Sequence, residues 1–160
     1  MTSVDHVAIA VRDLAAAAHL FVDVLGATLM YGGDNDATGV RILKLALADF
    51  RVELMQPISD DSRLARDLDR RGEGFHHVTL MVDDVARTVS DLAAAGLTTV
   101  GTDLASPRWS ETFLSPRDTF GALVQVASAS DDFGARVDEY TLDDVLAGRV
   151  AWVDKVACLR

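Results

Sequence analysis

A repeated strand motif with one histidine in each copy constrains the fold of this chain more than any other feature. The first copy is Val4-Asp-His-Val-Ala-Ile-Ala-Val-Arg-Asp13, and the second is His77-Val-Thr-Leu-Met-Val-Asp-Asp84. In each copy the histidine is followed by valine, then by mostly apolar residues, and then by acidic residues. Apolar, β-branched runs of this kind are typical of buried strands. The repeat therefore predicts two copies of one folding unit that face a shared site.

The order of predicted elements is β-α-β-β-β in both copies, which indicates an α+β fold made of two tandem βαβββ units. Strands are expected where apolar residues alternate or run together, and helices where an aspartate cap precedes a 3.6-residue periodicity that ends at glycine. The units span 1–57 and 74–130 within one domain of residues 1–130, the connector spans 58–73, and 131–160 is a C-terminal extension. The expected strands are 4–11, 27–31, 40–47, 50–56, 77–82, 98–104, 109–114 and 122–127, the helices are 14–25, 59–70 and 84–95, and 32–36 and 115–121 are turns or exposed loops.

Composition excludes several classes of function. A net charge of −10 argues against binding to a phosphate backbone, which requires clustered basic residues. The sequence shows neither a run of about 18 apolar residues, as a membrane span requires, nor a signal pattern at its start. The single cysteine, Cys158, cannot form an internal disulfide and fits a reducing compartment. We expect a cytoplasmic protein that binds a small molecule and neither nucleic acid nor a membrane.

Four polar residues occupy duplicated positions within apolar strands. His6 and His77 lie near the start of the first strand of each unit, and Glu53 and Gln125 lie in the last strand. Two imidazoles, a carboxylate and an amide oxygen suit one divalent first-row metal with open positions for a substrate. The metal is expected to be Co, Mn, Ni, Zn or Fe.

A structural interpretation competes with the metal site at each of these positions taken singly. A histidine on an apolar strand is commonly a hydrogen-bonded core residue, and Glu or Gln can face water from the wet side of a sheet. The duplication of all four positions favours the metal. Alternation in the strand points His76 away from His77, toward a supporting or surface role. Lys44 and Arg117 are expected at the solvated surface.

The segments Asp5–Leu14, Gly72–Leu80 and Phe113–Arg117 resemble the vicinal oxygen chelate superfamily, which includes glyoxalases, bleomycin resistance proteins and dioxygenases. They are most similar to its methylmalonyl-CoA epimerase branch and more distantly similar to glyoxalase I. The resemblance covers residues 4–128. It implies paired βαβββ units that form a half-open mixed β-barrel around one metal, with ligands at His6, Glu53, His77 and Gln125.

The chain departs from the epimerase pattern at positions that carry chemistry. Some epimerases have Gln at the position of Glu53 and Glu at the position of Gln125, and a catalytic Glu where this chain has Ile42. In the second unit, the position related to Ile42 is about Glu111. The carboxylates have thus exchanged across the pseudo-twofold axis. We predict that Glu111 is a general base, and the interpretation of Glu111 as a solvated surface residue is equally weighted. Glu53 is predicted to be a metal ligand and is the second catalytic candidate.

The predicted function is that of a metal-dependent isomerase or epimerase that removes a proton next to a metal-chelated carbonyl of a small oxo or acyl compound, including acyl-CoA. Two alternatives stay open on the same scaffold. Two histidines and Glu53 also suit an Fe(II)-dependent dioxygenase or another lyase. A non-catalytic protein that binds drugs in a groove between subunits would need more aromatic residues than this chain has. A homodimer is expected.

Overall fold

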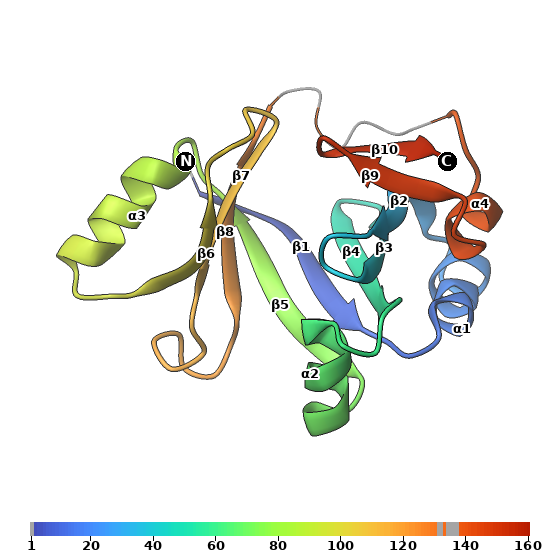
Figure 1. The fold of residues 1–160 in the computed structure, drawn as a ribbon, viewed down its shortest axis with the longest axis horizontal. Helices are drawn as coiled ribbons and strands as arrows, with labels where there is room; N and C mark the ends of the chain where they lie inside the picture. Colours follow the sequence, from blue (N-terminus) through green and yellow to red (C-terminus); the bar gives the residue numbers. More distant parts are fainter. Residues whose placement is uncertain (1, 131–132, 134–137) are drawn as a thin grey trace. The chain divides into compact units, whose positions relative to one another are not determined.

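The computed structural model describes residues 2–130, 133 and 138–160, and its element order contains the β-α-β-β-β pattern twice (Figure 1). The two repeats are joined by a helix, as predicted. The first repeat consists of β1 (Ser3–Ala10), α1 (Leu14–Ala18), the π-helical turn η1 (His19–Val24), β2 (Thr28–Asn35), β3 (Val40–Leu47) and β4 (Phe50–Pro57).

The connector and the second repeat also lie close to their predicted positions, and the chain then continues into elements that we did not predict as strands. The predicted start of the extension, at residues 131 and 132, lies outside the described residues. None of the described helices is long and apolar enough to cross a membrane. The elements are α2 (Arg63–Arg71), β5 (Gly74–Met81), α3 (Val85–Ala94), β6 (Thr99–Asp103), β7 (Trp109–Leu114), β8 (Val124–Ala129), α4 (Leu142–Leu146), β9 (Val150–Val153) and β10 (Val156–Leu159).

The strands form one ten-stranded sheet in the order β10-β9-β2-β3-β4-β1-β5-β8-β7-β6. Strands β10 and β6 are at its two ends, so the sheet is open. Most neighbours are antiparallel, but β5 pairs with β8, and β2 with β9, in parallel, so the sheet is mixed. The predicted α+β class with an open mixed sheet is confirmed.

The chain divides into two compact units, and neither unit has the same boundaries as a sequence repeat. One unit consists of Met1–Val7 with His76–Phe133, and the other of Ala8–Phe75 with Gly134–Arg160. The first contains the start of β1 and the second β-α-β-β-β repeat except the start of β5. The second contains the rest of β1, α1 to α2 and the C-terminal elements. We call them the 76–133 unit and the 8–75 unit, and the boundaries 1–130 and 131–160 stay predictions.

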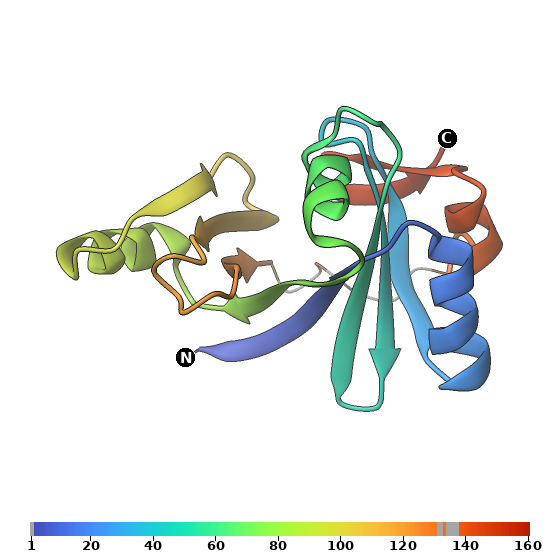
Figure 2. The ribbon, with the colours of Figure 1, turned by 90° about the horizontal axis from the view of Figure 1, so that it is seen from below.

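The 8–75 unit is built on the β3–β4 hairpin, which Figure 2 shows in teal. Its register places Leu47 opposite Phe50 and Lys44 opposite Glu53. Asp13 caps α1 through the N–H of Ala16, as the sequence predicted. The hairpin also contributes to an apolar cluster that α2 covers in part. The Ser62 side chain at the start of α2 accepts a hydrogen bond from the N–H of Ala65. The cluster consists of Ala8, Ala10, Val40, Met55, Leu64 and Leu68.

The predicted exposed loop at residues 32–36 is wrong, because β2 continues through Asn35. Gly32 and Gly33 are buried strand residues that make room for the C-terminal elements. A Cβ at Gly32 would lie 2.6 Å from the carbonyl oxygen of Ile42 and 2.9 Å from Cγ1 of Val145 on α4. At Gly33 it would lie 3.1 Å from Cγ1 of Val150 on β9. The glycines therefore mark a close approach between segments and not a turn.

Polar contacts fix the C-terminal elements to β2 and β3. Arg41 donates from Nε to Asp34 at 2.5 Å and from Nη1 to the carbonyl oxygen of Leu146 at 2.7 Å. The N–H of Gly32 donates to the hydroxyl of Tyr140, and burial raises the pKa of Tyr140. Arg160 pairs with Asp36, and this hydrogen bond raises the pKa of Arg160 further above its usual value. Residues 138–160 of the extension are thus part of the 8–75 unit.

The Asp34→Asn variant should loosen this extension. Asp34 is only 5% exposed and accepts two hydrogen bonds from Arg41, so the change leaves a half-buried guanidinium without its carboxylate. We expect the free energy of unfolding to fall by about 2 kcal/mol in urea denaturation, with faster hydrogen exchange in β9 and β10. The matched control is Asp36→Asn, because Asp36 is 62% exposed. Equal stability of the two variants would contradict the prediction.

Candidate metal-binding and acid–base site

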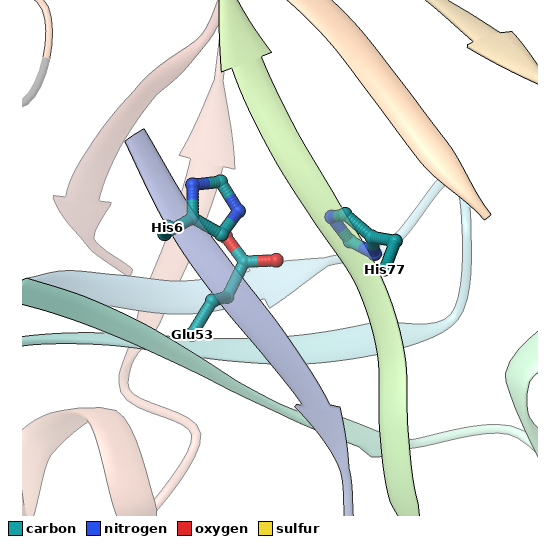
Figure 3. A group of neighbouring side chains, drawn as sticks. All are labelled: His6, Glu53 and His77. Carbon is teal, nitrogen blue, oxygen red and sulfur yellow. The ribbon is translucent and has the colours of Figure 1, made fainter. Parts of the chain in front are cut away.

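His6 and His77 lie on β1 and β5, on the inward faces that strand alternation predicted. They are 2% and 5% exposed, and the burial of Ala8, Ala10 and Thr79 at every second position confirms which face is inside. The two rings point toward one another with centroids 5.6 Å apart (Figure 3). Each ring offers a nitrogen, and these nitrogens lie within 4.8 Å of one another. The 76–133 unit therefore brings together the two histidines that the repeat singled out.

The Nδ1 atom of each histidine contacts the residue that precedes it in the sequence. His6 Nδ1 donates to the carboxylate of Asp5 at 2.6 Å. His77 Nδ1 lies 2.8 Å from Nδ1 of His76, whose ring is 5.1 Å from that of His77 by centroids. We expected His76 to point away from His77. Its half-buried ring instead turns back onto His77, and the supporting role of His76 stays a prediction.

Thr79 connects His6 to Gln125, a link that the sequence analysis missed. Its hydroxyl donates to Oε1 of Gln125 at 2.5 Å and lies 3.0 Å from Nε2 of His6. Thr79 and Gln125 are register partners in the parallel β5–β8 pair, and Thr79 is fully buried. The available signal was its position two residues after His77, which puts both side chains on one face.

Glu111 lies beside Gln125. One carboxylate oxygen, Oε2, accepts from Nε2 of Gln125 at 2.6 Å and from the indole nitrogen of Trp109 at 2.7 Å. Because a carboxylate accepts hydrogen bonds, Glu111 directs the NH2 group of Gln125 toward itself and the amide oxygen toward Thr79 and His6. A continuous chain of hydrogen-bonding groups thus runs from Asp5 through His6, Thr79 and Gln125 to Glu111.

Aromatic rings flank this chain of groups in the 76–133 unit. The ring of Phe113 meets that of His77 edge to face at 6.2 Å, and Phe113 is the register partner of Gln125 on β8. Trp109 stacks on Phe133 at 4.6 Å. Apolar surroundings of this kind exclude water and strengthen the electrostatic interactions of buried polar groups.

Glu53 is also drawn in Figure 3, on β4, and belongs to the 8–75 unit. Its Oε2 atom lies 3.9 Å from Nζ of Lys44, with the two side chains 13% and 1% exposed. We expected Lys44 at the solvated surface, and this is wrong. The two-residue turn of the hairpin places it opposite Glu53, and the carboxylate offsets the cost of burying the ammonium group. The ligand role of Glu53 stays a prediction.

Two other positions have clear outcomes. Ile42 packs against the apolar cluster of the 8–75 unit, so that β3 position offers no group for proton transfer. Arg117 is exposed in the turn after β7, as expected for a surface residue.

A sequence model described as the Glyoxalase/Bleomycin resistance protein/Dioxygenase superfamily matches residues 5–114 of this chain. The matched segment includes His6, Glu53, His77 and Glu111 and ends before Gln125. It spans more than half of the chain, from the first repeat to the end of β7 in the second.

Individual relatives extend the match. An ethylmalonyl-CoA/methylmalonyl-CoA epimerase from Cereibacter sphaeroides is 32% identical over 126 residues, which cover 76% of this chain and 94% of the relative. A methylmalonyl-CoA epimerase structure from Mycobacterium tuberculosis is 30% identical with a TM-score of 0.72, covering 79% of this chain and 87% of that one. A Streptomyces coelicolor methylmalonyl-CoA epimerase in complex with 2-nitronate-propionyl-CoA is 26% identical with a TM-score of 0.73, covering 82% of this chain and 96% of that one.

Proposed function

Because the chain belongs to the Glyoxalase/Bleomycin resistance protein/Dioxygenase superfamily, we propose that it is an acyl-CoA epimerase acting on a methylmalonyl-CoA-type thioester. Two of the relatives described above are named methylmalonyl-CoA epimerases and one has a name that includes this activity. The chain is an enzyme of their isomerase class. The substrate assignment is the proposal, and it implies that a small acyl-CoA molecule is the partner of the site.

The residues present fit a divalent metal. His6, His77 and Gln125 offer two imidazole nitrogens and an amide oxygen, and Glu53 is the proposed fourth ligand. The orientation of the Gln125 amide, with its oxygen on the side of His6, supports its place in the set. A bound divalent ion supplies positive charge that lowers the energy of an enolate-like form of the thioester. The identity of the metal stays open among Co, Mn, Ni, Zn and Fe.

Glu111 is the proposed base. The observation that carries this assignment is the direct hydrogen bond between Glu111 and Gln125. Thr79 in turn links Gln125 to the candidate ligand His6. With Oε2 held by Gln125 and Trp109, the other oxygen, Oε1, would take the proton from the carbon next to the thioester carbonyl. The two donors fix the carboxylate in one orientation, which a general base requires.

Epimerisation also needs a group that returns a proton to the opposite face of the carbon. Ile42 cannot do this, since its side chain is apolar and packs on an apolar cluster. Glu53 is the remaining carboxylate among the predicted site residues, and we propose it for this role as an alternative to direct ligation. In the epimerase pattern described above, the catalytic carboxylate lies in the first repeat, at the position of Ile42. Here the proposed base, Glu111, lies in the second repeat and Glu53 in the first.

The wild-type protein tests this proposal. In D2O, with Co²⁺ supplied, the enzyme should exchange the C2 proton of methylmalonyl-CoA for deuterium, which proton NMR measures as loss of the C2 signal. Succinyl-CoA, which lacks the branched carbon between two carbonyl groups, is the control and should exchange far more slowly. Absence of exchange with every one of the five candidate metals would contradict the proposed function.

A measurement of oxygen uptake distinguishes the epimerase from the dioxygenase alternative. His6, His77 and Glu53 make a two-histidine, one-carboxylate set that suits Fe(II). The epimerase proposal requires that the Fe(II)-loaded protein consume no oxygen with methylmalonyl-CoA in an oxygen electrode. Oxygen uptake that depends on His6 would favour the dioxygenase.

A further inference from the structure

We propose that His76 is a positioning residue that presents Nε2 of His77 to the metal, just as Asp5 presents Nε2 of His6. This inference rests on the metal site of the proposed function and assigns a role to a residue outside the ligand set. In both strands the residue directly before the histidine contacts its Nδ1 atom, at 2.6 Å for Asp5 and 2.8 Å for His76. The contact recurs although successive side chains of a strand ordinarily point to opposite faces.

The chemistry of the two contacts differs in one respect. The Asp5 carboxylate only accepts, so His6 carries its proton on Nδ1 when it uses Nε2 as a ligand. Between His76 and His77 one ring donates and the other accepts. If His77 donates, its Nε2 keeps a lone pair and can bind a metal. If His76 donates, His77 carries its proton on Nε2 and cannot. The contact with His76 therefore decides whether His77 is a competent ligand.

The rest of the site holds the His77 ring against His76, and the proposal requires that His77 is the donor in this contact. The edge-to-face contact with Phe113 limits rotation of the His77 ring, so that its Nδ1 stays directed at His76. His77 is 5% exposed, so solvent has little access to compete for that contact. Partners of this kind, which hold a ligand from the side away from the metal, typically change metal affinity by about 10- to 100-fold.

The experiment uses three variants of the full chain. His76→Ala removes the contact, and His76→Asp replaces the imidazole with a carboxylate that can only accept. Asp5 shows that an aspartate at the preceding strand position reaches Nδ1 in this fold. His19→Ala is the matched control, because Nδ1 of His19 also makes a side-chain contact at 2.8 Å, with the carboxylate of Asp23, but His19 is exposed on η1. Circular dichroism and thermal denaturation establish that each variant is folded.

Two readouts independent of activity decide the outcome. In titrations with Co²⁺ alone, His76→Ala should raise the Kd by about 10- to 100-fold, His76→Asp should restore it to near the wild-type value, and His19→Ala should leave it unchanged. In 15N NMR, His77 of the wild type should carry its proton on Nδ1, and His76→Asp should keep it there. A purely structural role for His76 would not be rescued by aspartate.

An unchanged Kd in His76→Ala, a failure of His76→Asp to restore binding, or a proton on Nε2 of wild-type His77 would each overturn the inference. A wild type that binds no Co²⁺ would overturn both the inference and the metal site. If the Co²⁺ affinities follow the expected order and methylmalonyl-CoA still shows no exchange, the positioning role stands and only the proposed epimerase activity fails.

Discussion

The Glu111→Gln variant is expected to lose turnover by about 100- to 10,000-fold while it keeps its fold and its metal, because an amide cannot accept the proton that general-base catalysis transfers. The change preserves size, and the new amide oxygen can still accept from Gln125 or Trp109, the two donors to Glu111. Turnover is measured as deuterium exchange into methylmalonyl-CoA, and metal content by elemental analysis.

Two comparisons make the Glu111 result specific. Glu139→Gln removes an exposed carboxylate and should leave the exchange rate unchanged. Trp109→Phe removes the indole donor but keeps the Glu111 carboxylate, so its exchange rate should fall between those of the wild type and Glu111→Gln. Exchange in Glu111→Gln at the wild-type rate would show that the base lies elsewhere.

The second large effect is expected for the buried pair of Lys44 and Glu53. Lys44→Met leaves a carboxylate without this neighbouring ammonium, and Glu53→Gln leaves the ammonium without this carboxylate. Each single variant should lower the free energy of unfolding by about 3–5 kcal/mol. The double variant should lie much closer to the wild type, since no unbalanced charge of the pair stays buried. Urea denaturation followed by circular dichroism in a chelator measures all four proteins without metal.

An exposed pair in the same chain supplies the control. Arg87 Nε and Asp91 Oδ2 on α3 are 3.8 Å apart, close to the 3.9 Å of Lys44 and Glu53, but their side chains are 81% and 72% exposed. The corresponding Arg87→Met and Asp91→Asn variants should change stability by less than about 0.5 kcal/mol each. If the Lys44 and Glu53 variants prove additive, then burial does not couple these two charges.

The elements with strong local signals were predictable from sequence. Asp13 and Asp84 cap their helices, and the side-chain oxygen of each accepts a hydrogen bond from the backbone N–H three residues on. The apolar alternation of β1 and β5 gave the buried faces of His6 and His77. These signals are local, so the sequence around each residue was sufficient to place it.

The strands β9 and β10 were not predicted because their stability depends on distant residues. Each contains only four residues, and the β9–β10 hairpin joins the sheet along β2, where Asp34 is the register partner of Ala151. For the same reason Gly32 and Gly33 resembled a loop. A glycine pair predicts a turn unless another segment packs against it, and the sequence alone does not show that segment.

Lys44 is a different case, because the sequence did contain its signal. The two residues between the predicted strands 40–47 and 50–56, Ala48 and Asp49, set the register of the hairpin. The fourth residue from this turn on each strand is Lys44 or Glu53, so the two lie opposite each other. We nevertheless predicted an exposed Lys44, because lysine side chains generally face solvent. The link through Thr79 required the parallel β5–β8 register, which no local pattern gives.

The composition of the compact units has a consequence for how the protein is made. Residues 1–7 leave the ribosome before residues 8–75, but they belong to the unit whose other residues, 76–133, emerge after them. At about 5–20 residues per second, the first seven residues wait roughly 6–25 s before that unit is fully synthesised. A ribosome-stalled chain that exposes residues 1–75 therefore carries β1, with His6, without its neighbour β5. Such a chain should be a substrate for chaperones that hold extended apolar segments.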